Sequence, residues 1–106
     1  MTKSEHPRKI RHRGLGEPSA VWEYRDPDGK VIGYDCRFET SGGKQVLPYT
    51  KQINGKFAWK GFPDPRPLYG LNRLAERPDA PVIICEGCKA ADANQEIIPD
   101  GVSVSW

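Results

Sequence analysis

Residues 83–89 contain the side chains of this chain whose types and spacing best suit chemistry. Glu86 follows a short apolar run, Gly87 permits a sharp turn, and Lys89 lies where the first turn of a helix is expected. Ligands gather at the carboxyl ends of strands in open α/β sheets. A carboxylate there can act as a general acid or base, or help to hold a metal ion. A glutamate at a strand end is most often only solvated, so both interpretations stay open.

The spacing Cys85-x-x-Cys88 suggests half a zinc site or a redox pair. A zinc site needs two more ligands, and only Cys36, His6 and His12 remain, without a second Cys-x-x-Cys. Cys88 near a helix N-terminus could have a lowered pKa, but Cys85 lies inside an apolar strand. We therefore expect Cys36 and Cys85 to be small core residues and expect no metal site. Three cysteines without a signal peptide favour a cytoplasmic protein.

The positive charge is concentrated at the N-terminus. The chain has 106 residues, with 16 Lys and Arg against 14 Asp and Glu. Residues 1–13 hold five of the basic residues and a single acid, so the remainder is slightly acidic. Such an arm can bind nucleic-acid phosphates by releasing counterions, or it can be a solvated tail. The candidate DNA-binding residues in it are Arg8, Lys9, Arg11 and Arg13.

The first half of the body alternates between apolar and polar residues, which is typical of antiparallel strands. Strands are expected at residues 20–25, 30–39 and 44–50, with a last hairpin of 51–53 and 57–60 around Asn54-Gly55. Asp26-Pro27-Asp28-Gly29 has the composition of a tight turn. The pattern predicts a four-stranded antiparallel meander.

Three prolines within residues 63–67 mark a boundary, and a different pattern follows. We expect a helix at 68–77, an apolar strand at 81–86, a helix at 89–98 and a strand at 102–106. The apolar stripe of the second helix is expected to be Ala90, Ala93, Ile97 and Ile98. The fold class is therefore α+β, a meander followed by a single βαβ unit. The expected domains are a flexible arm (1–17), the meander (18–61), and the helix with the βαβ unit (62–106).

Aromatic and basic residues on the meander offer a second candidate surface. An exposed row of rings could stack single-stranded bases, or the same rings could form the core of a small sheet; we favour the core. Lysines near the later strands, above all Lys44 and Lys60, could follow a phosphate backbone or could protect an edge strand.

Two motifs resemble a known family. The block Arg66-Pro-Leu-Tyr-Gly-Leu71, followed by Pro81-Val-Ile-Ile-Cys-Glu-Gly-Cys-Lys-Ala-Ala-Asp92, is similar to the start of the Toprim domain of phage, plasmid and integrated-element primases and primase–helicases. The resemblance covers roughly residues 18–106, with the meander matching the region before Toprim. It implies that Glu86 is the family's acidic residue for proton transfer or metal organisation. Gly87, Lys89 and Asp92 match the positions that follow.

The departures from the family point away from catalysis. Cys88 stands where these relatives usually carry a second acid, and their Mg²⁺-binding Asp-x-Asp after a later strand has no counterpart before Trp106. Phosphoryl transfer depends on metal positioning, which one carboxylate cannot replace. We expect no enzyme activity and no cofactor in this chain, with Mg²⁺ needed only in full-length relatives.

Two functions follow as expectations. The first is a non-catalytic fragment or remnant of a mobile-element DNA primase that binds single-stranded or primed DNA weakly in DNA replication. The alternative is a small phage or mobile-element interaction protein that inhibits a host or defence complex by protein contact. The longest apolar run, residues 80–85, is far shorter than the ~20 residues of a membrane span, so no membrane partner is expected.

Overall fold

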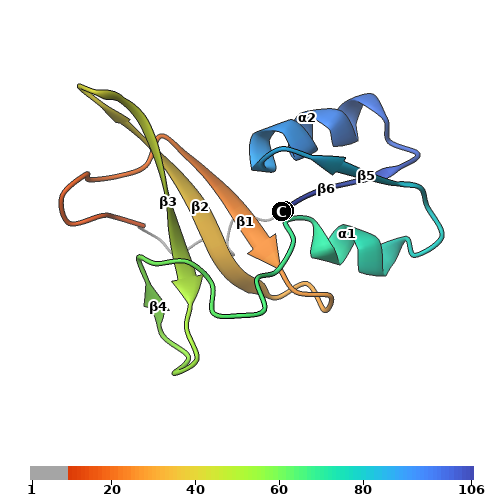
Figure 1. Cartoon of the computed structure of the whole chain (residues 1–106), viewed down its shortest axis with the longest axis horizontal. Helices are drawn as coiled ribbons and strands as arrows, with labels where there is room; N and C mark the ends of the chain where they lie inside the picture. The colour runs from red at the N-terminus through yellow and green to blue at the C-terminus, as the bar shows by residue number, and fades with distance from the viewer. Residues whose placement is uncertain (1–9) are drawn as a thin grey trace.

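The computed structural model describes residues 10–106, which form two sheets joined by a proline-rich loop (Figure 1). The N-terminal sheet has the strand order β1-β2-β3-β4, and the second sheet pairs β5 with β6. The α+β class is confirmed. The elements are β1 (Ala20–Arg25), β2 (Val31–Thr40), β3 (Gly43–Lys51), β4 (Phe57–Ala58), α1 (Leu71–Glu76), β5 (Val82–Cys85), α2 (Cys88–Ile97) and β6 (Val102–Ser105).

The N-terminal sheet is antiparallel throughout, as the alternation predicts. The β1–β2 turn is built on Asp26, whose Oδ1 accepts the N–H groups of Asp28 and Lys30, both at 2.9 Å. Gly29 follows at φ 89°, a backbone conformation that side chains disfavour. These local bonds set the turn, and the sheet's register follows from it. The last hairpin is shorter than expected, since β4 has only two residues.

Aromatic rings fill the core on one face of this sheet. Tyr34 and Phe38 of β2 are buried with Cys36 between them. The ring of Tyr49 of β3 packs at a tilt on that of Trp59 after β4, with their centroids 4.5 Å apart. The core interpretation is therefore confirmed for the rings on this face, which pack on one another, whereas Trp22 of β1 lies on the opposite face of the sheet.

The C-terminal unit (residues 69–106) is the expected βαβ unit, with β5 and β6 parallel and in register from Val82–Val102 to Cys85–Ser105. Helix α2 packs on one face, and α1 packs against β6. All four residues of β6 are buried. Tyr69 bridges the outer edge of β6 by exchanging two backbone hydrogen bonds with Ser105. Gly70 lets this segment approach closely, because a Cβ there would lie 2.9 Å from the Ser103 carbonyl oxygen.

The expected apolar stripe of α2 was wrong. Ala90, Ala93, Ile97 and Ile98 are all exposed, whereas Cys88 and Ala91 form the buried side. Helical spacing alone cannot choose between two small-residue faces, and alanine is compatible with either environment. Cys88 and Ala91 pack in one buried cluster with two bulky rings, those of Tyr24 and Tyr69.

The two units meet through those rings. Tyr24 of β1 packs edge to face on Tyr69 and on Phe62 of the connecting loop, with centroids 5.2 and 5.0 Å apart. Among residues 10–106, no helix is long and apolar enough to cross a membrane.

Candidate cleft between the N-terminal sheet and helix α2

A cleft of about 270 Å³ lies between the N-terminal sheet and the beginning of α2. Its walls carry charges of both signs around an apolar floor. The lining residues are Trp22, Asp35, Arg37, Lys44, Val46, Glu86, Gly87, Cys88 and Lys89. The cleft therefore joins the strand end that the sequence singled out to one face of the meander.

Strand register brings the sheet's contribution together. Trp22 of β1 lies opposite Asp35 of β2, and Arg37 of β2 lies opposite Val46 of β3. Lys44 stands two residues from Val46, so it shares the same face. This face is opposite the aromatic core, and it faces α2.

The second wall is the turn between β5 and α2. Gly87 adopts φ 102°, which turns the chain sharply after Glu86, and its N–H donates to Ser105 Oγ at 2.9 Å. No side chain caps the N-terminus of α2. Helix N-termini carry partial positive charge, so this end adds to the attraction that lysines exert on an anion.

The basic side chains of the cleft differ in whether they form an ion pair with an acidic side chain of the protein. Arg37 Nε lies 3.1 Å from the Glu39 carboxylate, although the angle between them is poor for a hydrogen bond. Lys44 and Lys89 are exposed and form no ion pair with the rest of residues 10–106. The same holds for Glu86. The cleft thus offers two lysines and a carboxylate to a ligand.

Asp35 ties the cleft to the buried junction. Its Oδ2 accepts the Tyr24 hydroxyl at 3.2 Å and lies 3.4 Å from Cys88 Sγ. Burial raises the pKa of the Cys88 thiol to about 12, and the Asp35 charge adds to this effect. The same burial raises the pKa of Tyr24. A neutral thiol is a poor nucleophile, so the geometry gives Cys88 a packing role and does not support a redox pair.

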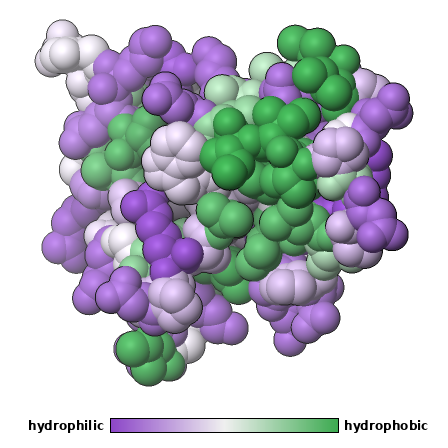
Figure 2. Space-filling view, turned by 45° about the vertical axis from the view of Figure 1, so that its right-hand side comes forward, coloured by the Kyte–Doolittle hydropathy of each residue, from purple (hydrophilic) through white to green (hydrophobic). Residues whose placement is uncertain are grey.

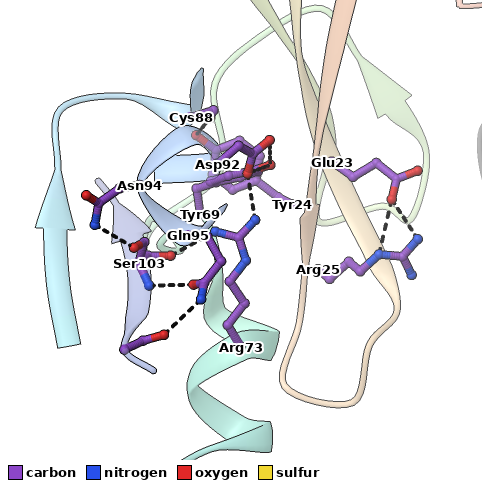
Figure 3. A network of polar contacts seen from close by, with 11 residues as sticks. Glu23, Tyr24, Arg25, Tyr69, Arg73, Cys88, Asp92, Asn94, Gln95 and Ser103 are labelled. Carbon is purple, nitrogen blue, oxygen red and sulfur yellow. Dashed lines mark hydrogen bonds and ion pairs between the residues drawn. The ribbon is translucent and has the colours of Figure 1, made fainter. Parts of the chain in front are cut away.

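Asp92 does not line the cleft and instead contacts Tyr69 and Arg73 (Figure 3). Its carboxylate accepts the Tyr69 hydroxyl at 2.8 Å and pairs with Arg73 at 2.6 Å. Arg73 also donates to the Ser103 carbonyl at 2.8 Å. Burial and the Asp92 charge raise the pKa of Tyr69. These contacts tie α2 to α1 and β6, which is a structural role for the motif aspartate.

The structure brings only part of the predicted set together. Lys44, Glu86, Gly87 and Lys89 line one cleft, whereas Lys60 does not line it. Arg11 pairs with Glu17 at 3.6 Å and Arg13 is exposed in the N-terminal segment. Arg8 and Lys9 lie outside the described residues. Sequence reasoning missed Trp22, Asp35 and Arg37 as lining residues, although the strand alternation places them on one face.

Within the described part of the chain, no three His, Cys, Asp or Glu side chains gather closely enough to hold a metal ion. Comparisons with protein families, with curated proteins and with solved structures found no match to this chain.

Proposed function

We propose that this protein is a non-catalytic relative of mobile-element DNA primases that binds single-stranded or primed DNA weakly. The observation that carries the proposal is the cleft, which Lys44, Lys89 and Trp22 line together with the N-terminus of α2. Phosphates are attracted by lysines and by helix N-termini, and bases stack on aromatic rings. The two motifs that resemble Toprim primases favour DNA as the ligand.

The proposal involves binding and no bond-making step. Glu86 is the one carboxylate of the family motif in the cleft, and Asp35 is already engaged by the Tyr24 hydroxyl. We assign Glu86 to contacts with base donors, such as amino groups, for which a carboxylate is a suitable acceptor. The cleft's mixed charge is consistent with weak binding, since its two acids oppose its basic residues.

Binding of a fluorescent single-stranded oligonucleotide, followed by anisotropy across a salt series, tests this function. We expect Lys44→Gln and Lys89→Gln each to weaken binding and to reduce the slope of log K against log salt by about 1. Lys56→Gln is the matched control. It removes the same charge from the β3–β4 hairpin, away from the cleft, and should leave the slope nearly unchanged.

Two results would contradict the proposal. The first is no detectable binding at about 50 mM salt, where phosphate contacts are strong. The second is an equal loss of affinity in all three lysine variants, which would mean that binding depends on the overall charge of the protein and not on the cleft. A Trp22→Leu variant adds a readout of stacking, because it should weaken binding without altering the salt slope.

A second candidate function, inhibition of a host or defence complex by protein contact, is favoured by one observation. Figure 2 shows a broad hydrophobic area on the side formed by the C-terminal unit. Its strand β5 exposes Val82 (51%) and Ile84 (65%). Large exposed apolar areas often mark interaction sites. This function predicts a complex that resists nuclease, persists in Lys44→Gln and is lost in Ile84→Lys; the opposite pattern would exclude it.

A further inference from the structure

Residues 10–16 fold back over the aromatic core of the N-terminal sheet. Ile10 is only 8% exposed and belongs to the buried cluster of Tyr34, Cys36 and Phe38, and Leu15 packs against the same cluster. The segment closes on itself by two backbone hydrogen bonds between His12 and Gly16, of 2.8 and 2.9 Å. A short loop thus covers one face of the sheet.

The His12 side chain holds this loop together. Its Nδ1 accepts the N–H of Gly14 at 3.0 Å and the N–H of Leu15 at 3.1 Å. Nδ1 must therefore be unprotonated, with the imidazole proton on Nε2. An imidazolium carries a proton on both nitrogens and has no acceptor. Protonation of Nδ1 would break both hydrogen bonds, because the new Nδ1–H would point at the N–H groups of Gly14 and Leu15 and could not accept from them.

The ring itself packs between aromatic side chains. It lies edge to face with Trp59 at 5.0 Å and with Phe38 at 5.8 Å, both uncharged. The charged side chains of β2 next to Phe38 are on the opposite face of the sheet, because neighbouring strand residues alternate. The charged residues on the surrounding elements are Arg11, Arg13 and Glu17 in the same segment, Asp35, Arg37 and Glu39 on β2, and Lys60 after Trp59.

These charges give the loop no strong hold on an imidazolium. Glu17, the acid of the same segment, is paired with Arg11 at 3.6 Å, and both are exposed. Arg13 and Lys60 carry the same sign as a protonated His12. A proton on the ring thus costs the loop its two hydrogen bonds, and no carboxylate within residues 10–106 is paired with the ring to offset the loss.

We propose that His12 is a proton-operated clasp. The neutral imidazole holds residues 10–16 on the aromatic face of the sheet, and protonation releases them and uncovers the rings of Phe38 and Trp59. Histidine is the side chain whose charge ordinarily changes between about pH 5 and 8, and this is the range in which the clasp is tested. The clasp lies on the face opposite the cleft and does not depend on the proposed DNA binding.

Amide NMR of the full chain between about pH 8 and pH 5 tests the clasp. The signals of Gly14 and Leu15 should shift together in a single titration. The protection factor of the Leu15 amide against hydrogen exchange should fall at least about tenfold, because its bond to Nδ1 is lost. The indole of Trp59 should shift with them, since its ring loses the contact with the imidazole.

His12→Asn is the matched control. An asparagine places Oδ1 where the imidazole has Nδ1, accepts the same backbone N–H groups in an Asx turn, and does not titrate. We expect the amides of Gly14 and Leu15 to stay protected and unshifted in this variant at low pH. The same acid response in the variant, or no response in the unaltered protein, would overturn the clasp.

A second measurement holds even where the variant is poorly folded. The ¹⁵N chemical shifts of the His12 ring in the unaltered protein report which nitrogen carries the proton. The clasp requires an unprotonated Nδ1 at about pH 8 and a doubly protonated ring at about pH 5. A proton on Nδ1 at the higher pH would contradict it, whatever the behaviour of the variant.

Discussion

The paired strands β5 and β6 differ in burial, and the difference is the reverse of what their compositions suggest. β5 (VIIC) is the more apolar, yet Val82 and Ile84 are more than half exposed. β6 (VSVS) contains two serines and is wholly buried. The serines are accommodated because their polar groups are bonded: Ser103 Oγ accepts from Asn94, and Ser105 Oγ accepts from the Gly87 N–H. Position in the topology, and not hydrophobicity, decides which strand is covered.

The outer edges of the two strands differ in the same way. The outer edge of β6 is occupied by the Tyr69 backbone at Ser105 and by the side chains of Gln95 and Arg73 at Ser103. No element within residues 10–106 pairs with the other edge of β5. An uncharged, unpaired edge is a surface on which another strand can pair. The two-stranded sheet of the C-terminal unit thus has one occupied edge, along β6, and one unpaired edge, along β5. In the N-terminal sheet, by contrast, residues 10–16 cover the aromatic core.

The largest expected effect on stability comes from the buried core of the N-terminal sheet, and a much smaller effect is expected from the exposed residues of β5. Phe38→Ala should lower the free energy of unfolding by about 4 kcal/mol, because it leaves a cavity among Tyr34, Trp59 and Ile10. Ile84→Ala should lower it by less than about 1 kcal/mol, since its side chain is 65% exposed. Urea unfolding at neutral pH measures both. Equal losses would mean that β5 is covered in solution, for example by a second molecule.

A sharper test uses two valines that face each other in the register. Val82 and Val102 are paired across β5 and β6, but Val102 is fully buried. Val102→Ala should cost about 2 kcal/mol, and Val82→Ala less than about 1 kcal/mol. The chemical change is identical, so the difference in urea midpoint reports burial alone. Indistinguishable midpoints would contradict the asymmetry between the two strands.

Sequence analysis anticipated the elements better than their packing. Alternation and turn residues such as Asp26 and Asn54 are local properties, so the meander and the βαβ unit were predictable. The motif residues Glu86 and Lys89 were found because they adjoin in sequence. Trp22 and Arg37 reach the cleft only through strand register and through the docking of α2. Those contacts join distant parts of the chain, which local patterns do not encode.

The choice of the buried face of α2 illustrates the same limit. Ala90 and Ala93 have a spacing as good as that of Cys88 and Ala91, and all four are small. The tyrosines that decide between them, Tyr24 and Tyr69, lie 64 and 19 positions before Cys88 in the sequence, on separate elements. The Tyr69 hydroxyl also needs Asp92 of α2 as its acceptor, which favours the observed rotation of the helix.

A smaller effect is expected at the polar contacts that join α2 to α1. Asp92→Asn should destabilise the fold by about 1 to 2 kcal/mol, because it removes the ion pair with Arg73 but keeps an acceptor for Tyr69. The Arg73 and Asp92 side chains are partly exposed, so part of the loss should disappear in about 0.5 M salt, where charges are screened. Glu39→Gln, which removes the ion pair with Arg37 in the N-terminal sheet, is a control for general charge effects. A loss that is equal in both variants would refute a specific role for Asp92.

The last prediction concerns the ionisation of the buried thiols, which should lower the stability of the fold at alkaline pH and leave it unchanged at neutral pH. Burial raises the pKa of Cys36 and of Cys88 to about 12, each helped by the Asp35 charge. An unfolded thiol ionises near 8.5, so the stabilisation is complete below that pH and is lost as the pH rises toward 12. The urea midpoint should therefore fall between about pH 8 and pH 11, with Tyr24 and Tyr69 contributing in the same direction.

Alanine variants of the cysteines assign this alkaline loss to the two units. Cys36→Ala tests the core of the N-terminal sheet, and Cys88→Ala tests the junction beneath Tyr24; each should make the midpoint less dependent on pH. Iodoacetamide at about pH 8 should modify Cys85 first, because Cys36 and Cys88 are buried and Cys85 is partly exposed. Faster modification of Cys88 would mean that the junction opens in solution, and that the two units separate more readily than their shared aromatic contacts indicate.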